Sequence, residues 1–387
     1  MAKAGTYDWL IVGAGFTGAT LAERLAAGCA QKVLVIDRRP HIAGNAYDER
    51  NENGLLVHRY GPHIFHTNSQ KIWNYLSRFT RWRAYSHHVL GVIDGRMVPI
   101  PFNLNTLYVL FPRQRADRVR EMLVARFGMG VKVPILKLRE TQDAELKELA
   151  DYIYEKIFLH YTQKQWGRRP EELDPSVTAR VPVFISRDDR YFQDSYQAMP
   201  EDGFTALFGR MLDHPGIRVE LKTDFTALPP TIAHHTVFTG AIDEFFRYEA
   251  GELPYRSLHF DFVTKAQERF QPVGQVNYPN DFEFTRITEQ KHITGQQSPL
   301  TALVYEYPQP YRRGVNVPYY PIPCPESKAL LRPYLDSAES LKGKVWFAGR
   351  LADYQYYNMD QACARALSLF EKELAPACRS YTAAARA

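Results

Sequence analysis

Glycine residues near the N-terminus are spaced as in a loop that binds a dinucleotide. Residues 13–18 read GAGFTG and follow an apolar run over residues 7–12 that predicts a buried strand. Gly13 permits a tight turn, Gly15 lets the backbone approach a pyrophosphate, and Gly18 lets a helix pack closely on the strand. A helix that begins here would direct its free N–H groups and its positive dipole end at the phosphates. The pattern therefore predicts phosphate binding at this turn.

An acidic residue completes the pattern. Residues 19–26 have helical spacing, and a second apolar run over residues 32–36 ends at Asp37, so the order is strand, glycine loop, helix, strand, acid. Asp37 is placed to accept a hydrogen bond from a ribose hydroxyl. GxGxxG alone also occurs in ordinary glycine-rich turns, but this complete order predicts a bound dinucleotide. The 2′-phosphate of NADP would meet the like charge of Asp37, which disfavours NADP. The neighbouring cations Arg38 and Arg39 keep NADP as an alternative.

A segment near the C-terminus favours FAD over NAD. Residues 344–350 predict a short strand that stops at Gly349, and after a tyrosine-rich loop residues 358–367 predict the start of a helix. In flavoproteins of the two-dinucleotide type, such a segment returns to the first domain, with its glycine beside the ribityl phosphate and its helix directed at the flavin. The positive helix end would favour the anionic reduced flavin. The alternative is an ordinary final strand and helix.

Composition and charge argue against several classes of protein. The 387 residues suit two or three domains, and 45% hydrophobic with 24% charged residues is normal for a globular protein. A net charge of +5 with both signs interspersed argues against a nucleic-acid partner. No apolar run reaches the roughly 18 residues that a membrane span needs. The four cysteines form no CxxC pair and we find no secretion signal, so we expect reduced thiols and a cytoplasmic protein.

The middle of the chain predicts two further units. Residues 115–127 and 143–159 have helical spacing. Residues 167–182 form a polar stretch with three prolines, which is typical of a lid with little regular structure. Short alternating runs then predict an antiparallel sheet with one solvated face; these runs are residues 257–263, 282–287 and 301–307. The strands that we expect to return to the dinucleotide domain are residues 217–221 and 236–240.

Besides the glycine loop, specific motifs are distributed along nearly the whole chain. They are residues 61–67 (GPHIFHT), 161–166 (YTQKQW), 180–183 (RVPV), 190–192 (RYF), 200–205 (PEDGFT), 284–287 (FTRI), 318–322 (PYYPI), 347–350 (FAGR) and 356–360 (YYNMD). Together they resemble one family closely, the bacterial type of UDP-galactopyranose mutase.

The resemblance implies an α/β fold class with a discontinuous Rossmann-like FAD domain of the two-dinucleotide-binding type, an inserted helical domain and an antiparallel β-sheet domain. The FAD domain would comprise residues 1–84, 204–248 and 326–387. The helical domain would comprise residues 101–190, with a mobile lid at about 167–182. The antiparallel sheet and substrate domain would comprise residues 85–100, 191–203 and 249–325.

The activity implied by the resemblance is the interconversion of UDP-galactopyranose and UDP-galactofuranose, which supplies galactofuranose for cell-surface glycans. Reduced FAD would act through its N5 as nucleophile at the anomeric carbon, with no net redox change and with NAD(P)H as the reductant. The family implies a UDP-sugar ligand and a homodimer. The runner-up hypothesis is an FAD-dependent amine oxidase or desaturase, and a third is a dinucleotide-binding sensor without catalysis.

The resemblance also assigns residues to the substrate. Arg180 on the lid and Arg350 beside the flavin would clamp the diphosphate, because guanidinium groups match phosphate oxygens in a bidentate way. Each assignment has an alternative. A single arginine could be a solvated surface charge, and Arg286 could form a cross-strand salt bridge. The aromatic residues could simply pack in the core. The implied substrate-binding residues are Trp166, Arg180, Tyr191, Phe192, Asn277, Arg286, Glu306, Tyr320 (or its neighbour Tyr319), Arg350, Tyr356 and Asn358.

His63 and His66 stand three residues apart, which on spacing alone could suggest a metal pair. Gly61-Pro62 argues against a helix there, and no third ligand lies nearby in the sequence, so we expect no metal. The resemblance places this loop against the flavin, with His66 or its neighbour close to N5; the alternative is a structural loop histidine. The catalytic residues implied are Arg180, Arg350, His66 and His63. The cofactor-binding residues implied are Gly13, Gly15, Phe16, Thr17, Gly18, Asp37, Arg38, Asn45, His63, Val219, Gly349, Arg350, Asn358, Met359 and Asp360.

Overall fold

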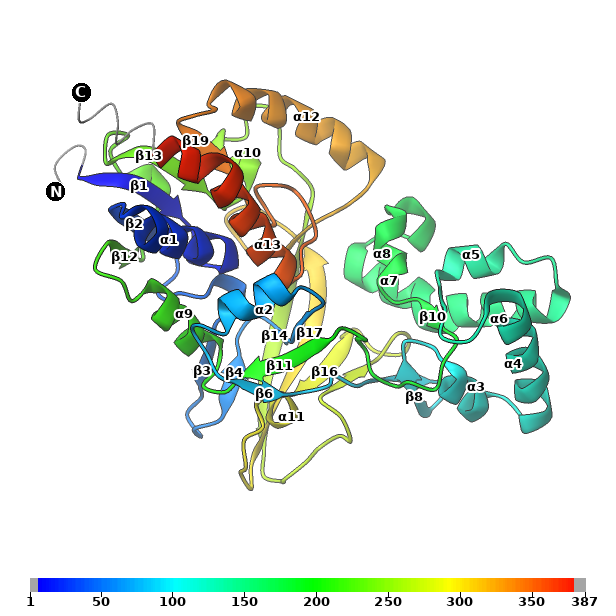
Figure 1. Ribbon diagram of the computed structural model, residues 1–387. Coiled ribbons are helices and arrows are strands. Elements are labelled where there is room, and N and C mark those ends of the chain that lie inside the picture. Colours follow the sequence, from blue (N-terminus) through cyan, green and yellow to red (C-terminus); the bar gives the residue numbers. More distant parts are fainter. Residues whose placement is uncertain (1–5, 379–387) are drawn as a thin grey trace.

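The computed structural model describes residues 6–378, and its first unit is a parallel sheet (Figure 1). Its five strands run in the order β12-β2-β1-β13-β19, and each neighbouring pair is parallel. The strands are β1 (Tyr7–Val12), β2 (Val33–Asp37), β12 (Ile217–Leu221), β13 (Ala233–Phe238) and β19 (Val345–Phe347). The prediction that the strands near residues 217 and 236 return to the first domain is therefore confirmed.

Helices cover this parallel sheet and form its core with it. Trp9, Leu21, Phe208 and Cys363 are all buried in one hydrophobic cluster. Helix α1 contacts α13 and α9, and Figure 1 shows α1 and α13 side by side although they lie at opposite ends of the chain. The helices of this part are α1 (Phe16–Cys29), α2 (Gln70–Leu76), α9 (Phe204–Leu212), α10 (Ile242–Phe245), α12 (Pro325–Ser340) and α13 (Met359–Leu369).

The second unit is a seven-stranded sheet in the order β18-β14-β17-β16-β15-β7-β8. All neighbours are antiparallel except β15 and β7, which are parallel. Its strands are β7 (Val89–Ile93), β8 (Arg96–Ile100), β14 (Tyr255–Lys265), β15 (Gln275–Asn277), β16 (Arg286–Glu289), β17 (Thr301–Pro310) and β18 (Tyr320–Pro321), and helix α11 (Gln290–Thr294) follows β16.

Small sheets complete the β-structure. A three-stranded sheet joins β5 (Phe65–Thr67), β11 (Tyr196–Pro200) and β6 (Trp82–Ala84), so residues 196–200 pair with segments of the first unit and not with the seven-stranded sheet. The remaining strand pairs are β3 (Asp48–Arg50) with β4 (Leu56–His58), and β9 (Lys132–Val133) with β10 (Val183–Phe184).

The helical unit lies to one side of both sheets (Figure 1). The two helices predicted here are confirmed, and the second continues through a π-helical stretch, residues 154–159, into α7. The helices are α3 (Leu104–Leu110), α4 (Arg113–Phe127), α5 (Ile135–Arg139), α6 (Ala144–Ile153), α7 (His160–Trp166) and α8 (Pro175–Ala179).

Two local predictions from the sequence are wrong. Residues 167–182 were expected to have little regular structure but contain a 3-10 helix over Pro170–Glu172 and helix α8, because two of their prolines occupy first helical positions, where they fit. The predicted strand over residues 282–287 begins only at Arg286. The carbonyl oxygens of Phe282 and Phe284 accept hydrogen bonds from Lys164 Nζ (2.8 and 3.4 Å) and are therefore used outside a sheet.

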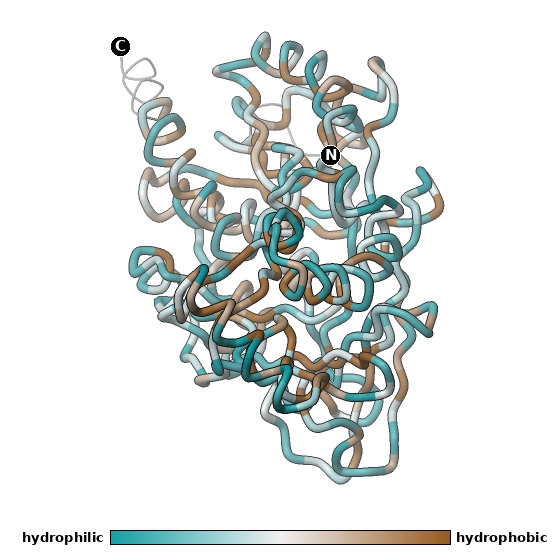
Figure 2. The backbone as a smooth tube through the Cα atoms, turned by 90° about the vertical axis from the view of Figure 1, so that its right-hand side faces the viewer, coloured by the Kyte–Doolittle hydropathy of each residue, from teal (hydrophilic) through white to brown (hydrophobic). Residues whose placement is uncertain are grey.

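Hydropathy is mixed along the chain. Figure 2 shows hydrophobic and hydrophilic residues alternating along the helices, as expected for helices with one buried face. Over residues 6–378, no helix is both long and apolar enough to cross a membrane.

The close approach at the glycine loop yields a test of the fold. A Cβ atom on Gly18 would lie 1.9 Å from the carbonyl oxygen of Gly13. We expect Gly18→Ala to lower the free energy of unfolding by about 1–3 kcal/mol, since the overlap is with backbone that must shift. Gly209→Ala in α9 is the matched control, because its Cβ would meet nothing within 4 Å. Both variants are compared by urea unfolding. If Gly18→Ala and Gly209→Ala have the same free energy of unfolding, the close packing at Gly18 is contradicted.

Candidate active site

Two adjoining cavities lie where the parallel sheet meets the seven-stranded sheet. The larger has a volume of about 600 Å³ and is lined by the glycine loop and by the end of β2. The smaller has a volume of about 150 Å³ and is lined mainly by histidines, tyrosines and arginines. The residues that line both are Asn45, His63, Tyr319, Arg350, Asn358 and Met359.

The larger cavity has the features of a dinucleotide site. Asp37 is held at the end of β2 by two backbone N–H groups: that of Ala14 donates to its Oδ2 (3.0 Å) and that of Arg39 to its Oδ1 (2.9 Å). Helix α1 begins after Gly15, which has no side chain to cap the helix, so its first N–H groups are available to an anion. Helix α13 begins beside the same cavity after Asn358. Two positive helix ends therefore face one cavity.

The structure brings most of the predicted cofactor residues to this cavity. Gly18 does not line it, because this glycine packs against Gly13. Val219 also does not, since it packs from β12 into the hydrophobic core. Asp360 accepts a hydrogen bond from Thr67 Oγ1 (2.9 Å) instead. The predicted residues that line the cavity are Gly13, Gly15, Phe16, Thr17, Asp37, Arg38, Asn45, His63, Gly349, Arg350, Asn358 and Met359.

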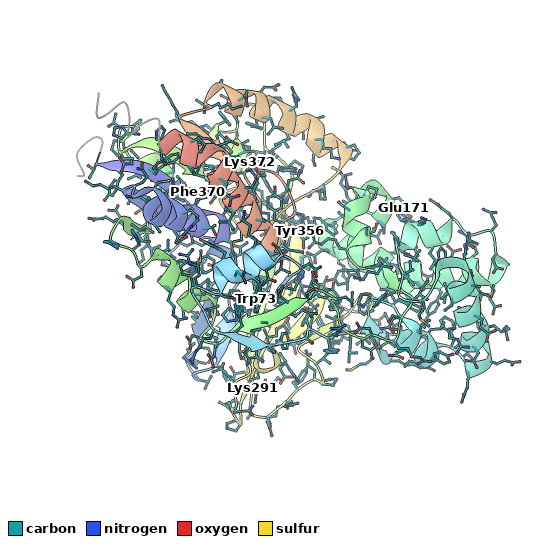
Figure 3. The ribbon with its side chains drawn as sticks, viewed as in Figure 1. Trp73, Glu171, Lys291, Tyr356, Phe370 and Lys372 are labelled. Carbon is teal, nitrogen blue, oxygen red and sulfur yellow. The ribbon has the colours of Figure 1, made fainter. Side chains whose placement is uncertain are left out.

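Two arginines meet at one tyrosine beside the smaller cavity. Arg180 at the end of the lid donates to the Asn358 side-chain oxygen, and its Cζ lies 4.1 Å from the Tyr356 ring centroid. Arg350 Nη2 donates to the carbonyl oxygen of Tyr357 (2.7 Å), and its Cζ lies 5.6 Å from the same Tyr356 ring. Figure 3 shows Tyr356 between the sheets and the helical unit. Both guanidinium groups thus bond to neutral oxygens. Arg350 lines the smaller cavity, whereas Arg180 does not line it and instead contacts Tyr356 and Asn358, which do.

Arg286 has a carboxylate partner. It stands opposite Glu306 on neighbouring strands, and its Nη2 lies 2.7 Å from Glu306 Oε1. Burial by itself would lower the pKa of Arg286, but the charge of Glu306 holds it well above its ordinary value. The contact is close but not aligned as a hydrogen bond, so Arg286 Nε and both Glu306 oxygens are buried without a hydrogen-bond partner. The cross-strand salt bridge named as the alternative from the sequence is therefore present, beside the cavity.

Aromatic side chains form the walls between these charges. Phe192 stacks on His66 with ring centroids 3.6 Å apart, and Tyr191 meets Phe192 edge-on. Trp166 is buried against Tyr356, with centroids 5.6 Å apart, and does not line either cavity. Tyr319 and Tyr320 both line the smaller cavity, so the two alternatives from the sequence lie together.

The loop histidines differ in their surroundings. His63 Nδ1 lies 2.9 Å from the carbonyl oxygen of Gly61, which can only accept, so Nδ1 carries the proton. Burial lowers the pKa of His63 to about 3, and the ring is neutral. His66 Nδ1 lies 3.0 Å from Asp194 Oδ2, and this hydrogen bond lowers the pKa of Asp194. Over residues 6–378, no group of three or more metal-ligating side chains is present.

Other residues of the smaller cavity were not predicted from the sequence. His87 and Gln275 line it, and Gln275 Nε2 donates to Asn277 Oδ1 (2.9 Å). Asn277 itself does not line the cavity, so its link to the site passes through Gln275. The only signal for His87 was its place just before an apolar run, and Gln275 stands on a three-residue strand too short to show a pattern.

This fold and site define a Rossmann-type dinucleotide-binding enzyme with a second cavity lined by Arg286 and Arg350. A family model described as NAD(P)-binding Rossmann-like domain matches residues 11–79, and one described as UDP-galactopyranose mutase matches residues 156–356. A probable UDP-galactopyranose mutase of Klebsiella pneumoniae is 36% identical, with 94% of each chain covered. A dTDP-fucopyranose mutase of Escherichia coli is 34% identical, with 92% of this chain and 96% of that protein covered. The chain belongs to the UDP-galactopyranose mutase family, a family of isomerases.

Solved structures share the fold over almost the whole chain. A crystal structure of reduced UDP-galactopyranose mutase has a TM-score of 0.71 at 15% identity and covers 96% of each chain. A cyclohexylamine oxidase from Brevibacterium oxydans has a TM-score of 0.55 at 13% identity and covers 95% of this chain and 99% of that chain. The architecture is therefore common to a mutase and an oxidase.

Buried neutral histidines yield a prediction about pH. Burial lowers the pKa of His58 to about 4 and of His63 and His87 to about 3. The unfolded chain takes up protons at these groups near pH 6.5, whereas the folded chain does not, so stability is present above pH 6.5 and falls as the pH drops towards 3–4. From pH 7.5 to pH 5 we expect each histidine to cost at most about 2 kcal/mol of unfolding free energy.

Urea unfolding at both pH values measures this loss. The backbone N–H of His63 donates to His58 Nδ1 (3.1 Å). His58→Asn keeps an acceptor for this N–H but removes the titrating ring. This variant should lose less stability on acidification than the wild type. Equal losses would show that His58 does not titrate in this way.

Proposed function

We propose that this protein interconverts UDP-galactopyranose and UDP-galactofuranose with FAD in its reduced state and without net oxidation. The observation that carries the proposal is that Arg286 and Arg350 line a cavity that adjoins a dinucleotide cavity, and that Arg180 contacts Tyr356 and Asn358 of the same lining. A site with this excess of guanidinium groups suits a ligand with two phosphates. Family membership and the names of its relatives support a UDP-sugar as that ligand.

FAD fits the larger cavity. Asp37 would accept from the ribose, the amino end of α1 would bind the phosphates, and the flavin would lie towards His63, Gly349 and Arg350, where the two cavities adjoin. Reduced FAD supplies an electron-rich N5 that can form a bond to the anomeric carbon of the sugar. His63 would present an unprotonated Nε2 next to this ring system, because its Nδ1 proton is directed at Gly61.

The arginines would act on the leaving group. Breaking the bond between the sugar and UDP places additional negative charge on the diphosphate, and fixed cations beside it stabilise that charge. Arg350 is held by its bond to the Tyr357 carbonyl, whereas Arg180 is carried on the lid. A diphosphate would replace the neutral oxygens that Arg180 and Arg350 now contact, so both residues gain a charged partner only when the ligand is bound.

The remaining residues would bind the sugar and the base. The unpaired Glu306 oxygens can accept hydrogen bonds from sugar hydroxyls, and the Nε of Arg286 can donate one. Tyr191 and Phe192 offer aromatic faces to uracil. Closure of the lid would exclude water while the sugar is detached from UDP.

Further parts of the proposal rest on the family. They are the homodimer, NAD(P)H as the reductant, the cytoplasmic location, and the division into an FAD domain, a helical domain and a sheet domain. The oxidase hypothesis from the sequence shares the fold, but its reactions consume an oxidant in each turnover and do not call for a cluster of arginines.

The direct test is an assay on purified protein. Protein reduced with dithionite and incubated with UDP-galactofuranose should yield UDP-galactopyranose on chromatography, while an oxidised aliquot should yield none. Conversion at equal rates in both redox states would contradict the role of reduced FAD. Conversion of a dTDP-fucofuranose but not of the UDP-sugar would assign the chain to the substrate named for its E. coli relative.

Arg180 supplies a sharper test of the site. Arg180→Ala should lower kcat/KM by about 100-fold or more, because a cation that faces the departing diphosphate is lost, while FAD stays bound. Arg169→Ala is the matched control, since Arg169 lies on the same lid but pairs with Glu171. A variant at Arg180 that turns over at the wild-type rate would remove this residue from the mechanism.

A further inference from the structure

One wall of the larger cavity comes from outside the parallel sheet. Residues 311–318, which connect β17 to β18 and are called the strap here, contribute a series of side chains to the lining. Asp37, Arg38, Glu244 and Tyr248 of the Rossmann part also line this cavity. The strap residues that line the cavity are Tyr311, Arg313, Gly314, Asn316, Val317 and Pro318.

The strap has a defined conformation. Asn316 bridges it, since its Oδ1 accepts from the Arg312 N–H (2.8 Å) and its Nδ2 donates to the Pro310 carbonyl oxygen (3.0 Å). At the other end, Ser257 Oγ donates to the Val317 carbonyl oxygen (2.7 Å) and ties the strap to β14. Gly314 has a φ of +75°, a conformation that favours glycine at the tip. Arg313 is therefore presented on an ordered loop.

The strap touches the Rossmann part at the rim of the cavity. The Cζ atom of Arg313 lies 4.5 Å from the Tyr248 ring centroid, and its Nε lies 3.1 Å from Glu252 Oε1. Tyr311 of the strap and Tyr248 also line the cavity together. Both members of the Arg313–Glu252 pair are about half exposed, and such a pair contributes little by itself. These contacts hold the strap at the rim of the cavity. They do not explain why the cationic residue Arg313 also lines the cavity.

The position along the cavity shows which part of a dinucleotide would meet the strap. Asp37 marks the ribose of the adenosine half. Arg38 follows Asp37 and pairs with Glu244 (2.7 Å), which is on the same wall as Tyr248. The opposite end of the cavity, at His63 and Arg350, adjoins the substrate cavity and belongs to the flavin. Arg313 thus lies at the adenosine end.

We infer that the strap binds the adenosine diphosphate half of the cofactor and that Arg313 is its main contact. A guanidinium group can stack on the adenine plane or pair with a phosphate oxygen, and both chemistries belong to this half of FAD. The cofactor would then join the two sheets, with the Rossmann part on one side and the strap of the seven-stranded sheet on the other. The inference rests on the proposed FAD site but not on the sugar that is converted.

Release of flavin from the holoenzyme tests this inference. After dilution, Arg313→Ala should release FAD about fivefold faster or more than the wild type, as followed by the rise of free flavin fluorescence. Protein refilled with FMN, which lacks the adenosine half, should release it at the same rate with and without the substitution. Arg312→Ala is the matched control, because Arg312 is an exposed neighbour that does not line the cavity.

The outcomes separate the strap from the rest of the proposal. Equal FAD release by wild type and Arg313→Ala, or an equal effect on FAD and FMN, would overturn the role of the strap. Asn316→Ala, which loosens the strap without removing the cation, should also speed FAD release, and no change there would count against it. A wild-type protein that holds no flavin would overturn the FAD site as well, whereas bound FAD without mutase activity would overturn only the proposed reaction.

Discussion

Positive charge held near a cavity is the constraint on which the rest of this site depends. Arg180 and Arg350 both face the ring of Tyr356, and Arg286 lines the smaller cavity with its charge balanced by Glu306. Like charges at short range raise each other's energy, most of all where water is scarce. The site tolerates them because one arginine is neutralised, one is bonded to a carbonyl and one is carried on the lid. Under the proposed function a diphosphate would relieve this repulsion, so closure of the lid and binding of a dianion would favour each other.

Much of the first unit could be predicted because its signals are local. The apolar runs of β1 and β2, the glycines between them and Asp37 lie within forty residues, and their order alone specifies the strand, glycine turn and helix that the structure shows. The strand near residue 236 was also visible as an apolar run. Val219 shows the limit of such signals, because its strand was predicted correctly but its side chain packs into the core and not into the cavity.

The substrate side could not be read from local patterns. Glu306 and Arg286 meet only because β16 and β17 pair in one register, and the sequence does not specify that register. His87 and Gln275 come to one cavity because β15 runs parallel to β7, a pairing between segments far apart in the chain. The failed strand at residues 282–285 has the same origin, since Lys164 of α7 takes carbonyl oxygens that an isolated hairpin would have used. Family resemblance supplied Arg286 and Glu306 where periodicity could not, but it did not supply His87 or Gln275.

The proposed function requires a lid, and the contacts on either side of Gly167 bear on where that lid would hinge. Before the lid, the buried guanidinium of Arg256 donates to the carbonyl oxygens of Lys164 and Gln165 (2.9 Å each), and bonds of this charged, buried kind contribute about 1.5–3 kcal/mol. Within the lid, Asp174 meets Lys328 in an exposed pair (3.0 Å) that contributes at most about 1 kcal/mol. Between them stands Gly167, with a φ of +70° that glycine adopts without strain. The end of α7 is therefore fixed to the sheet by a buried charge, and under the proposed function Gly167 is the point about which the lid would open.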